Sequence, residues 1–231
     1  MMKFRTVVAA ALAVGVSLTA VNAYAFGLGD VTGAVTGNSG GAAVDVGALV
    51  TQGKGLMGKF NSAFSNMTAA EGHTAQALGL KDESEKLLAL SEAYKAGNVV
   101  DNDQIARDVS ISEDASKAIQ DKLAAGGKVD AASKKSLLTA VPFYGKGIVE
   151  TAGLPTEFSN YAKSALNGIS SLKTNPLDAA KLAYGVSTPI SVATKLPDLV
   201  TTFGQTSKNF VSFSQSNSVA VKGVADKLGG L

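Results

Sequence analysis

Apolar or small side chains recur at spacings of three and four along most of the chain from residue 44 onward. One run steps in this way through Phe158, Ala162, Ala165, Ile169 and Leu172, and a second through Leu199, Phe203, Thr206, Phe210 and Phe213. This spacing places the side chains on one face of an α-helix. Bounded runs of β-branched residues in strict alternation, which would indicate strands, are not found. The sequence therefore predicts an all-α fold.

Residues typical of helix ends divide this pattern into segments. Glycines at 97, 126 and 127 are stop signals, because glycine readily adopts the left-handed conformation that closes a helix. Three N-caps are expected before helical patterns: Asp101 or Asp103 for the first, Asp130 for the second and Asn175 for the third, which is followed by a proline at the first helical position. Ser110 has capping-box spacing to Glu113 and is expected to begin a further helix.

Three prolines lie inside apolar patterns and are expected to kink or break their helices. Proline lacks a backbone N–H and its ring clashes with the preceding turn. Pro142 should interrupt the helix that follows Asp130, while Pro189 and Pro197 should interrupt the last third of the chain. Together these signals predict a bundle of about seven to nine short-to-medium helices, some of them Pro-kinked.

The first 25 residues have the features of a cleaved secretory signal. Lys3 and Arg5 form a positive start, and residues 7–21 are apolar, which is too short for a typical membrane-spanning helix. Ala23 and Ala25 provide the small residues of a cleavage site, so cleavage is expected after Ala25. The predicted location is the periplasm or the exterior of a bacterium, without a lipid-modified N-terminal cysteine.

Three segments are expected: a signal peptide at 1–25, a Gly-rich flexible leader at 26–43 and a single helical domain at 44–231. A subdivision of that domain near 126–130 remains possible, since two glycines occur there. The leader also has apolar residues at helical spacing, so a membrane-seeking N-terminus is the alternative interpretation.

Composition excludes several kinds of chemistry. The chain has no cysteine and one histidine, which excludes disulfides, thiolate metal sites and sites built from several histidines. The net charge is +2, and cleavage removes Lys3 and Arg5, so the mature chain is neutral. We therefore expect no nucleic-acid partner. No cofactor and no metal are expected.

Three short motifs resemble functional signatures but lack the context that those signatures need. Residues 53–58 match G-x-G-x-x-G, yet no βαβ pattern surrounds them, and small residues at a helix–helix contact explain them better. Residues 101–103 resemble the start of a calcium loop, but the required glycine and glutamate are absent, so a helix cap is favoured. Residues 170–173 fit S-x-x-K, and a hydrolase that uses Ser170 or Ser171 remains an alternative to a protein without enzymatic activity.

The single histidine, His73, occurs in the polar stretch 71–74. We expect this stretch to be a junction between helices and His73 to be solvated there. Acidic residues at 82, 83 and 85 are typical of the exposed start of a helix. The sequence thus provides no pair of carboxylates that points to acid–base catalysis.

Two aromatic segments are the candidate surface for a ligand or partner. The first has a proline break beside two aromatic residues, and the second is a helical stripe of phenylalanines; the residues are Pro142, Phe143, Tyr144, Ile148, Phe203, Phe210 and Phe213. Ordinary helix packing would also explain both segments. Ligand pockets, however, combine apolar walls with irregular backbone of this kind.

These observations favour a non-enzymatic exported helical-bundle protein that binds a protein partner or an apolar or lipid ligand. The alternative is a membrane-active helical protein that inserts or oligomerises on bilayers through the leader or the apolar segment 141–148. The identity of the partner, the oligomeric state and the biological process stay open.

Overall fold

A computed structural model describes residues 44–97, 101–172 and 175–230. The predicted signal peptide and leader lie outside the described residues. The elements are α1 (Val46–Ala77), α2 (Lys81–Lys95), α3 (Asn102–Ala125), α4 (Ala131–Thr151), α5 (Leu154–Ser171), α6 (Pro176–Ser216), the short α7 (Lys222–Ala225) and a 3-10 turn at Leu228–Gly230. No strand occurs in these residues, so the all-α prediction is confirmed.

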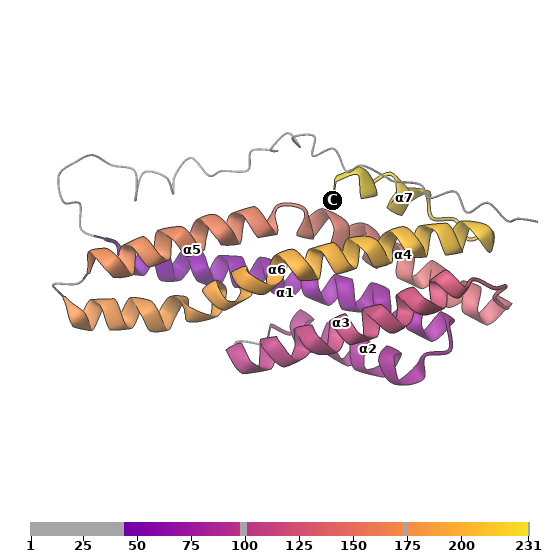
Figure 1. The fold of residues 1–231 in the computed structure, drawn as a ribbon, viewed down its shortest axis with the longest axis horizontal. Helices are drawn as coiled ribbons and strands as arrows, with labels where there is room; N and C mark the ends of the chain where they lie inside the picture. Colours follow the sequence, from indigo (N-terminus) through magenta and orange to yellow (C-terminus); the bar gives the residue numbers. More distant parts are fainter. Residues whose placement is uncertain (1–43, 98–100, 173–174, 231) are drawn as a thin grey trace, which may run out of the picture.

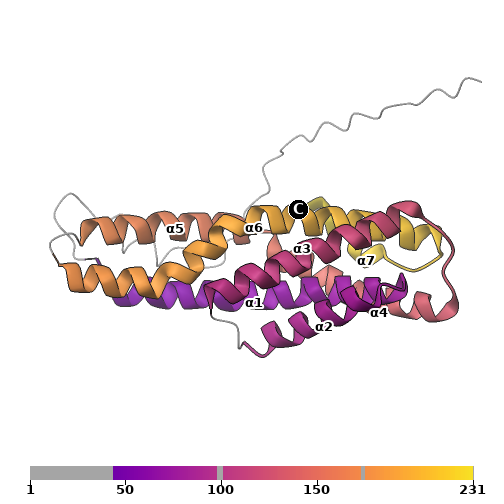
Figure 2. The same cartoon turned by 60° about the horizontal axis from the view of Figure 1, so that its bottom comes forward.

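The helices form an elongated bundle around α1 (Figure 1). The start of α1 packs with α5 and with the first half of α6 at one end of the bundle. The remainder of α1 is surrounded by α2, α3, α4 and the second half of α6 (Figure 2). α1 contacts each of the five other long helices and is therefore the central element.

The described chain has six long helices and the single turn α7, so the expected count of seven to nine is not confirmed. The count differs because expected boundaries do not occur. Ser110 lies inside α3 and starts no helix. Residues 71–74 are no junction either, because α1 continues to Ala77 with Glu71, Gly72 and Thr74 buried. Local polarity indicates a loop there, but tertiary packing surrounds the segment and keeps it helical.

The prolines do not break their helices. α4 continues through Pro142, and the 41-residue α6 continues through Pro189 and Pro197. The path of α6 bends along its length instead (Figure 2). Each proline removes one backbone hydrogen bond, but buried neighbours such as Val186, Pro189 and Val192 hold the helix against the bundle.

The predicted helix ends are confirmed where a side chain or a glycine defines them locally. Asp101 Oδ1 accepts a hydrogen bond from the amide of Gln104 at 2.8 Å, and Asp130 Oδ1 accepts one from Ser133 at 2.7 Å. Asn175 Oδ1 accepts from Asp178 at 3.4 Å. Gly97 and Gly126 have φ angles of 69° and 68°, in the region that favours glycine.

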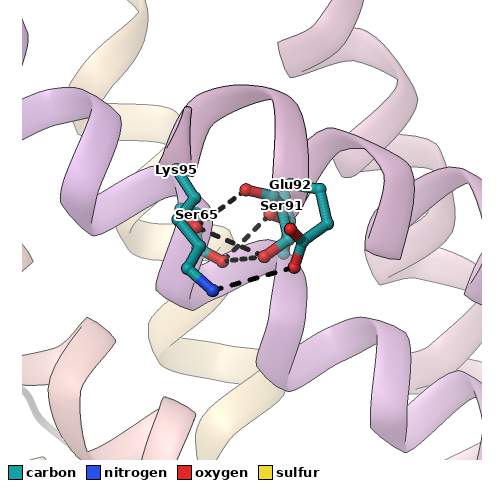
Figure 3. A network of polar contacts seen from close by, with 5 residues as sticks. Ser65, Ser91, Glu92 and Lys95 are labelled. Atoms are coloured by element: carbon teal, nitrogen blue, oxygen red, sulfur yellow. Dashed lines mark hydrogen bonds and ion pairs between the residues drawn. The ribbon is translucent and has the colours of Figure 1, made fainter. Parts of the chain in front are cut away.

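Close approach between helices depends on small residues. Ser65 on α1 and Ser91 on α2 each donate a hydrogen bond to the other's backbone carbonyl, at 2.8 and 2.9 Å (Figure 3). About two turns further along α1, a side chain at Gly72 would overlap Leu88 of α2. The two helices therefore pack at a distance that larger side chains would not allow.

The G-x-G-x-x-G motif lies inside α1, where no strand precedes it. Gly53 is buried at the contact with α5 and α6, and a Cβ there would overlap the Tyr161 hydroxyl and lie 3.1 Å from Cγ of Pro189. That hydroxyl donates a hydrogen bond to the Leu49 carbonyl at 3.1 Å. Gly55 and Gly58 face open space. A helix–helix contact therefore explains the first glycine of the motif but not the other two.

This difference gives a matched pair of variants within one helix. Gly53→Ala should lower the free energy of unfolding by about 1–3 kcal/mol, because Tyr161 must move and its hydrogen bond is strained. Gly55→Ala should raise it by about 0.5–1 kcal/mol, because alanine is the better helix former at an exposed position. Urea unfolding followed by circular dichroism measures both values, and equal stabilities would contradict the described packing of α1 on Tyr161.

Candidate functional site

The inner face of α3 carries a row of polar residues at intervals of four. Asp108, Ser112 and Ser116 are buried, and Gln120 is half-buried. Residues four apart lie on the same face of a helix, so the row runs parallel to the helix axis. Buried polar groups need hydrogen-bond partners. The row therefore identifies where α3 contacts polar groups of other helices.

Glu71 on α1 is the acidic group at the centre of this arrangement. Its side chain is 1% exposed, and its Oε1 accepts a hydrogen bond from Ser116 Oγ at 2.8 Å. Burial raises the pKa of Glu71 from 4.5 to about 7, although hydrogen bonds from Ser116, Thr206 and Ser112 act in the opposite direction. None of the ion pairs found in the described residues includes Glu71. A buried carboxyl with hydroxyl partners thus holds a proton near neutral pH.

Polar contacts extend from Glu71 to α6. Gln120 Nε2 donates to Thr206 Oγ1 at 2.9 Å, and Thr206 Oγ1 donates to the Thr202 carbonyl at 3.0 Å. The Thr206 hydroxyl also lies close enough to Glu71 to lower its pKa. Thr206 therefore joins the neighbourhood of Glu71 to α3 through Gln120 and to the backbone of α6 through Thr202.

Tyr144 brings α4 to the same region. Thr74 Oγ1 lies 3.3 Å from the Tyr144 hydroxyl, and the tyrosine ring stacks on Phe210 and Phe203 with centroid distances of 4.2 and 5.6 Å. Burial, with a smaller effect from the charge of Glu71, raises the pKa of Tyr144 well above its ordinary value. Tyr144 is therefore neutral at any physiological pH.

A second buried acid lies at the other end of the polar row. Tyr94 of α2 donates a hydrogen bond from its hydroxyl to Asp108 Oδ2 at 3.2 Å. Burial raises the pKa of Asp108, while this hydrogen bond and the charge of Arg107 lower it. The polar seam, defined here as Asp108, Ser112, Ser116 and Gln120 with their partners Tyr94, Glu71 and Thr206, thus joins α3 to α1, α2 and α6.

The structure brings together three of the seven candidate residues, since Tyr144 stacks between Phe203 and Phe210 and all three are fully buried. Ile148 and Phe213 are also buried, whereas Pro142 is exposed. Phe143 is half-buried, and its ring stacks on His73 at 5.6 Å. The role of these residues in binding a ligand or partner stays a prediction.

The other motif residues have simple local environments. His73 lies inside α1 and half-buried, so the expectation of a solvated junction residue is wrong. Ser170 and Ser171 are exposed at the end of α5, where Ser171 Oγ donates to the Asn167 carbonyl. Residues 101–103 cap and begin α3. Across residues 44–97, 101–172 and 175–230, no cluster of three metal-ligating side chains is found.

The first half of α6 presents an unusual outer surface. Leu177, Ala180 and Tyr184, at spacings of three and four, are all exposed, and we call them the outer α6 face. Tyr184 is 88% exposed and Leu177 is 66% exposed, whereas Leu182 and Val186 on the inner side are fully buried. This part of α6 therefore has apolar residues on two sides. In the part of the chain that the structure describes, no helix is long and apolar enough to cross a membrane.

Sequence reasoning missed Glu71 and the polar seam. Glu71 was placed in a polar junction, although it follows an apolar run that ends in two alanines. The spacing of Asp108, Ser112, Ser116 and Gln120 is visible in the sequence, but it equally fits a solvent-facing side. Which side faces the core depends on the pairing with α1 and α6, and one sequence does not reveal that pairing.

Comparison with known proteins finds no matching family model, no matching curated protein and no matching solved structure.

The buried Glu71 predicts a specific dependence of stability on pH. Because the folded protein binds this proton more tightly than the unfolded chain, the contribution of Glu71 to stability is greatest below pH 4.5 and is lost as the pH rises to about 7. A shift from 4.5 to about 7 corresponds to a loss of about 3 kcal/mol, most of it between pH 5 and 7. Urea unfolding at a series of pH values measures this loss.

Glu71→Gln should remove this slope of the free energy of unfolding against pH, because glutamine has nearly the same shape as glutamate but has no proton to lose. Asp114→Asn on the exposed side of α3 is the matched control and should keep the slope. Asp108 adds a smaller slope of the same sign, which begins near its ordinary pKa of 3.8 and remains in both variants. The same loss between pH 5 and 7 in Glu71→Gln and in the wild type would contradict the assignment.

Proposed function

We propose that this chain is a non-enzymatic exported helical-bundle protein that binds a protein partner through the outer α6 face. The supporting observation is Tyr184, a large side chain that is 88% exposed on a helix whose opposite side is already packed in the core. Exposed apolar residues grouped on one face mark interaction surfaces, and tyrosine is enriched among residues that dominate binding energies. The partner that fits this face has an apolar surface of its own.

The position of this face makes it suitable for docking. Leu177 and Tyr184 are seven residues apart, which is two turns, so their side chains point in the same direction. The helix beneath them is held by close contacts, since a side chain at Gly185 would overlap Val50 of α1. A rigid helix lowers the entropy cost of binding, because little of the surface must be ordered in the complex.

Export is the second part of the proposal, and its support is the sequence of residues 1–25. The positive start, the apolar stretch and the small residues at 23 and 25 favour passage to the periplasm or the exterior. A protein with a neutral mature chain and an exposed apolar helix face fits a role in protein binding better than a role in binding polyanions.

Photo-crosslinking in the cells that express the full chain tests the binding face. Tyr184 is replaced by the photoreactive residue p-benzoylphenylalanine, and Lys208, an exposed position further along α6, receives the same residue as a control. We expect a discrete protein adduct from position 184 and none of that mass from position 208. The mass of the adduct distinguishes a second copy of this chain from a different protein, and either is a protein partner.

A second substitution shows whether the adduct depends on the apolar face. Leu177→Ser should reduce the yield at position 184 by about tenfold, the loss expected for about 1–2 kcal/mol of buried leucine contact. Leu138→Ser, a similarly exposed leucine on α4, is the matched control and should leave the yield unchanged. Crosslinking to lipid alone would favour the membrane-active alternative, and no adduct at position 184 would overturn the proposal.

A further inference from the structure

α3 is attached to the bundle differently from its neighbours. Its buried side combines five apolar residues with the polar seam; the apolar residues are Ile105, Val109, Ala115, Ile119 and Leu123. Hydrogen bonds of the seam link it to Tyr94, Glu71 and Thr206 on three other helices. Polar layers bury fewer apolar atoms and compete with water once exposed, so such an interface is easier to open than an apolar one.

The C-terminal end of α3 has the geometry of a hinge beside a fixed point. Gly126 and Gly127 have φ angles of 68° and 120°, which only glycine adopts easily. From the carbonyl of Gly127 onward the chain is held by Asn217, whose Nδ2 donates to that carbonyl and whose Oδ1 accepts from the Val129 amide, both at 3.0 Å. α3 can therefore rotate about the glycines while α4 stays fixed.

The groups around Glu71 determine what happens when it loses its proton. From α3 it faces the neutral Ser112 and Ser116, and from α6 the neutral Thr206. From α4 it faces Tyr144, which stays neutral. α2 packs on α1 at Gly72 through Leu88, which carries no charge. None of these described neighbours of Glu71 is a cation, so an ionised Glu71 gains no opposite charge from them.

Two further charged groups lie along the seam near Tyr94. Asp108 is held by the Tyr94 hydroxyl, and Arg107 lies close enough to lower the pKa of Asp108. Both groups lie earlier along α3 than Ser116, which donates a hydrogen bond to Glu71. On the side of α1 away from α3, His73 stacks on Phe143.

We propose that α3 is a proton-controlled strap, fastened to α1 and α6 when Glu71 is protonated and released about the Gly126–Gly127 hinge when Glu71 is ionised. In the released state water reaches Glu71 and hydrates its charge, which removes the cost of burial. Release uncovers the side of α1 that carries Glu71 and the side of α6 that carries Thr206. The device is independent of the outer α6 face.

Hydrogen exchange of the full chain, resolved by peptide and corrected for the intrinsic effect of pH, tests the strap. The amides of α3 should open about tenfold more often for each pH unit between pH 5 and 7, and then no further, because one proton is released on opening. The amides of α4 and of the α5–α6 pair should show no such increase. An equal increase in all helices overturns the proposal, since the whole bundle would then open together.

Variants assign the opening to Glu71. Glu71→Gln should make the protection of α3 independent of pH, while Asp114→Asn should behave like the wild type. Ser116→Ala removes a hydrogen bond that favours the ionised form, so opening should level off at a higher pH than in the wild type. Ser116→Ala keeps the proposal testable if Glu71→Gln does not fold. An unchanged pH dependence in either Glu71→Gln or Ser116→Ala overturns it.

Discussion

The enclosure of the second half of α1 is the constraint on which the rest of the structure depends. From Ala63 to Ala77 nearly every side chain of α1 is buried, because α2, α3, α4 and α6 surround it. Such a segment needs small residues for close contact and a partner for every polar group. Thr68 and Thr74 donate to carbonyls of their own helix, and Ser65 exchanges hydrogen bonds with Ser91. Glu71 is the one acid in this stretch, and its partner comes from α3.

The need to satisfy Glu71 explains why α3 carries polar residues on its inner side. Ser112 and Ser116 provide hydroxyl groups at the level of Glu71, and Gln120 continues the row to Thr206. Hydrogen bonds from these hydroxyls compensate only part of the cost of a buried charge, so Glu71 keeps its proton to a higher pH than an exposed glutamate. The packing of α3 therefore depends on the protonation of a residue on another helix. α4 contributes Leu137, Ala140 and Ile148 to the core, and these side chains do not titrate.

The helical fold and several helix ends could be predicted because their causes are local. Asp101 and Asp130 accept hydrogen bonds from amides three residues away, and Gly126 adopts its conformation without help from distant residues. The continuity of α6 through Pro189 could not be predicted, because burial of the helix offsets the lost hydrogen bond. Glu71 was misplaced for the same kind of reason: its polar neighbours in sequence suggest a loop, while its neighbours in space keep it in a helix. The spacing of Leu177, Ala180 and Tyr184 in the sequence fits one helix face, but periodicity does not distinguish a face toward the core from one toward solvent.

The polar seam packs on the second half of α1, whereas the outer α6 face belongs to the part of α6 that packs on the start of α1. The two regions also differ in their chemistry. Near the outer α6 face, α1 is held by the contact of Gly53 with Tyr161 and by the contact of Val50 with Gly185. Burial raises the pKa of Tyr161 to about 12, so its hydrogen bond to Leu49 is unaffected between pH 5 and 8. Tyr161 therefore stays neutral over the pH range in which Glu71 loses its proton. It follows that a protein bound at Tyr184 should stay bound while α3 opens, and that the two surfaces can act in one molecule without competing.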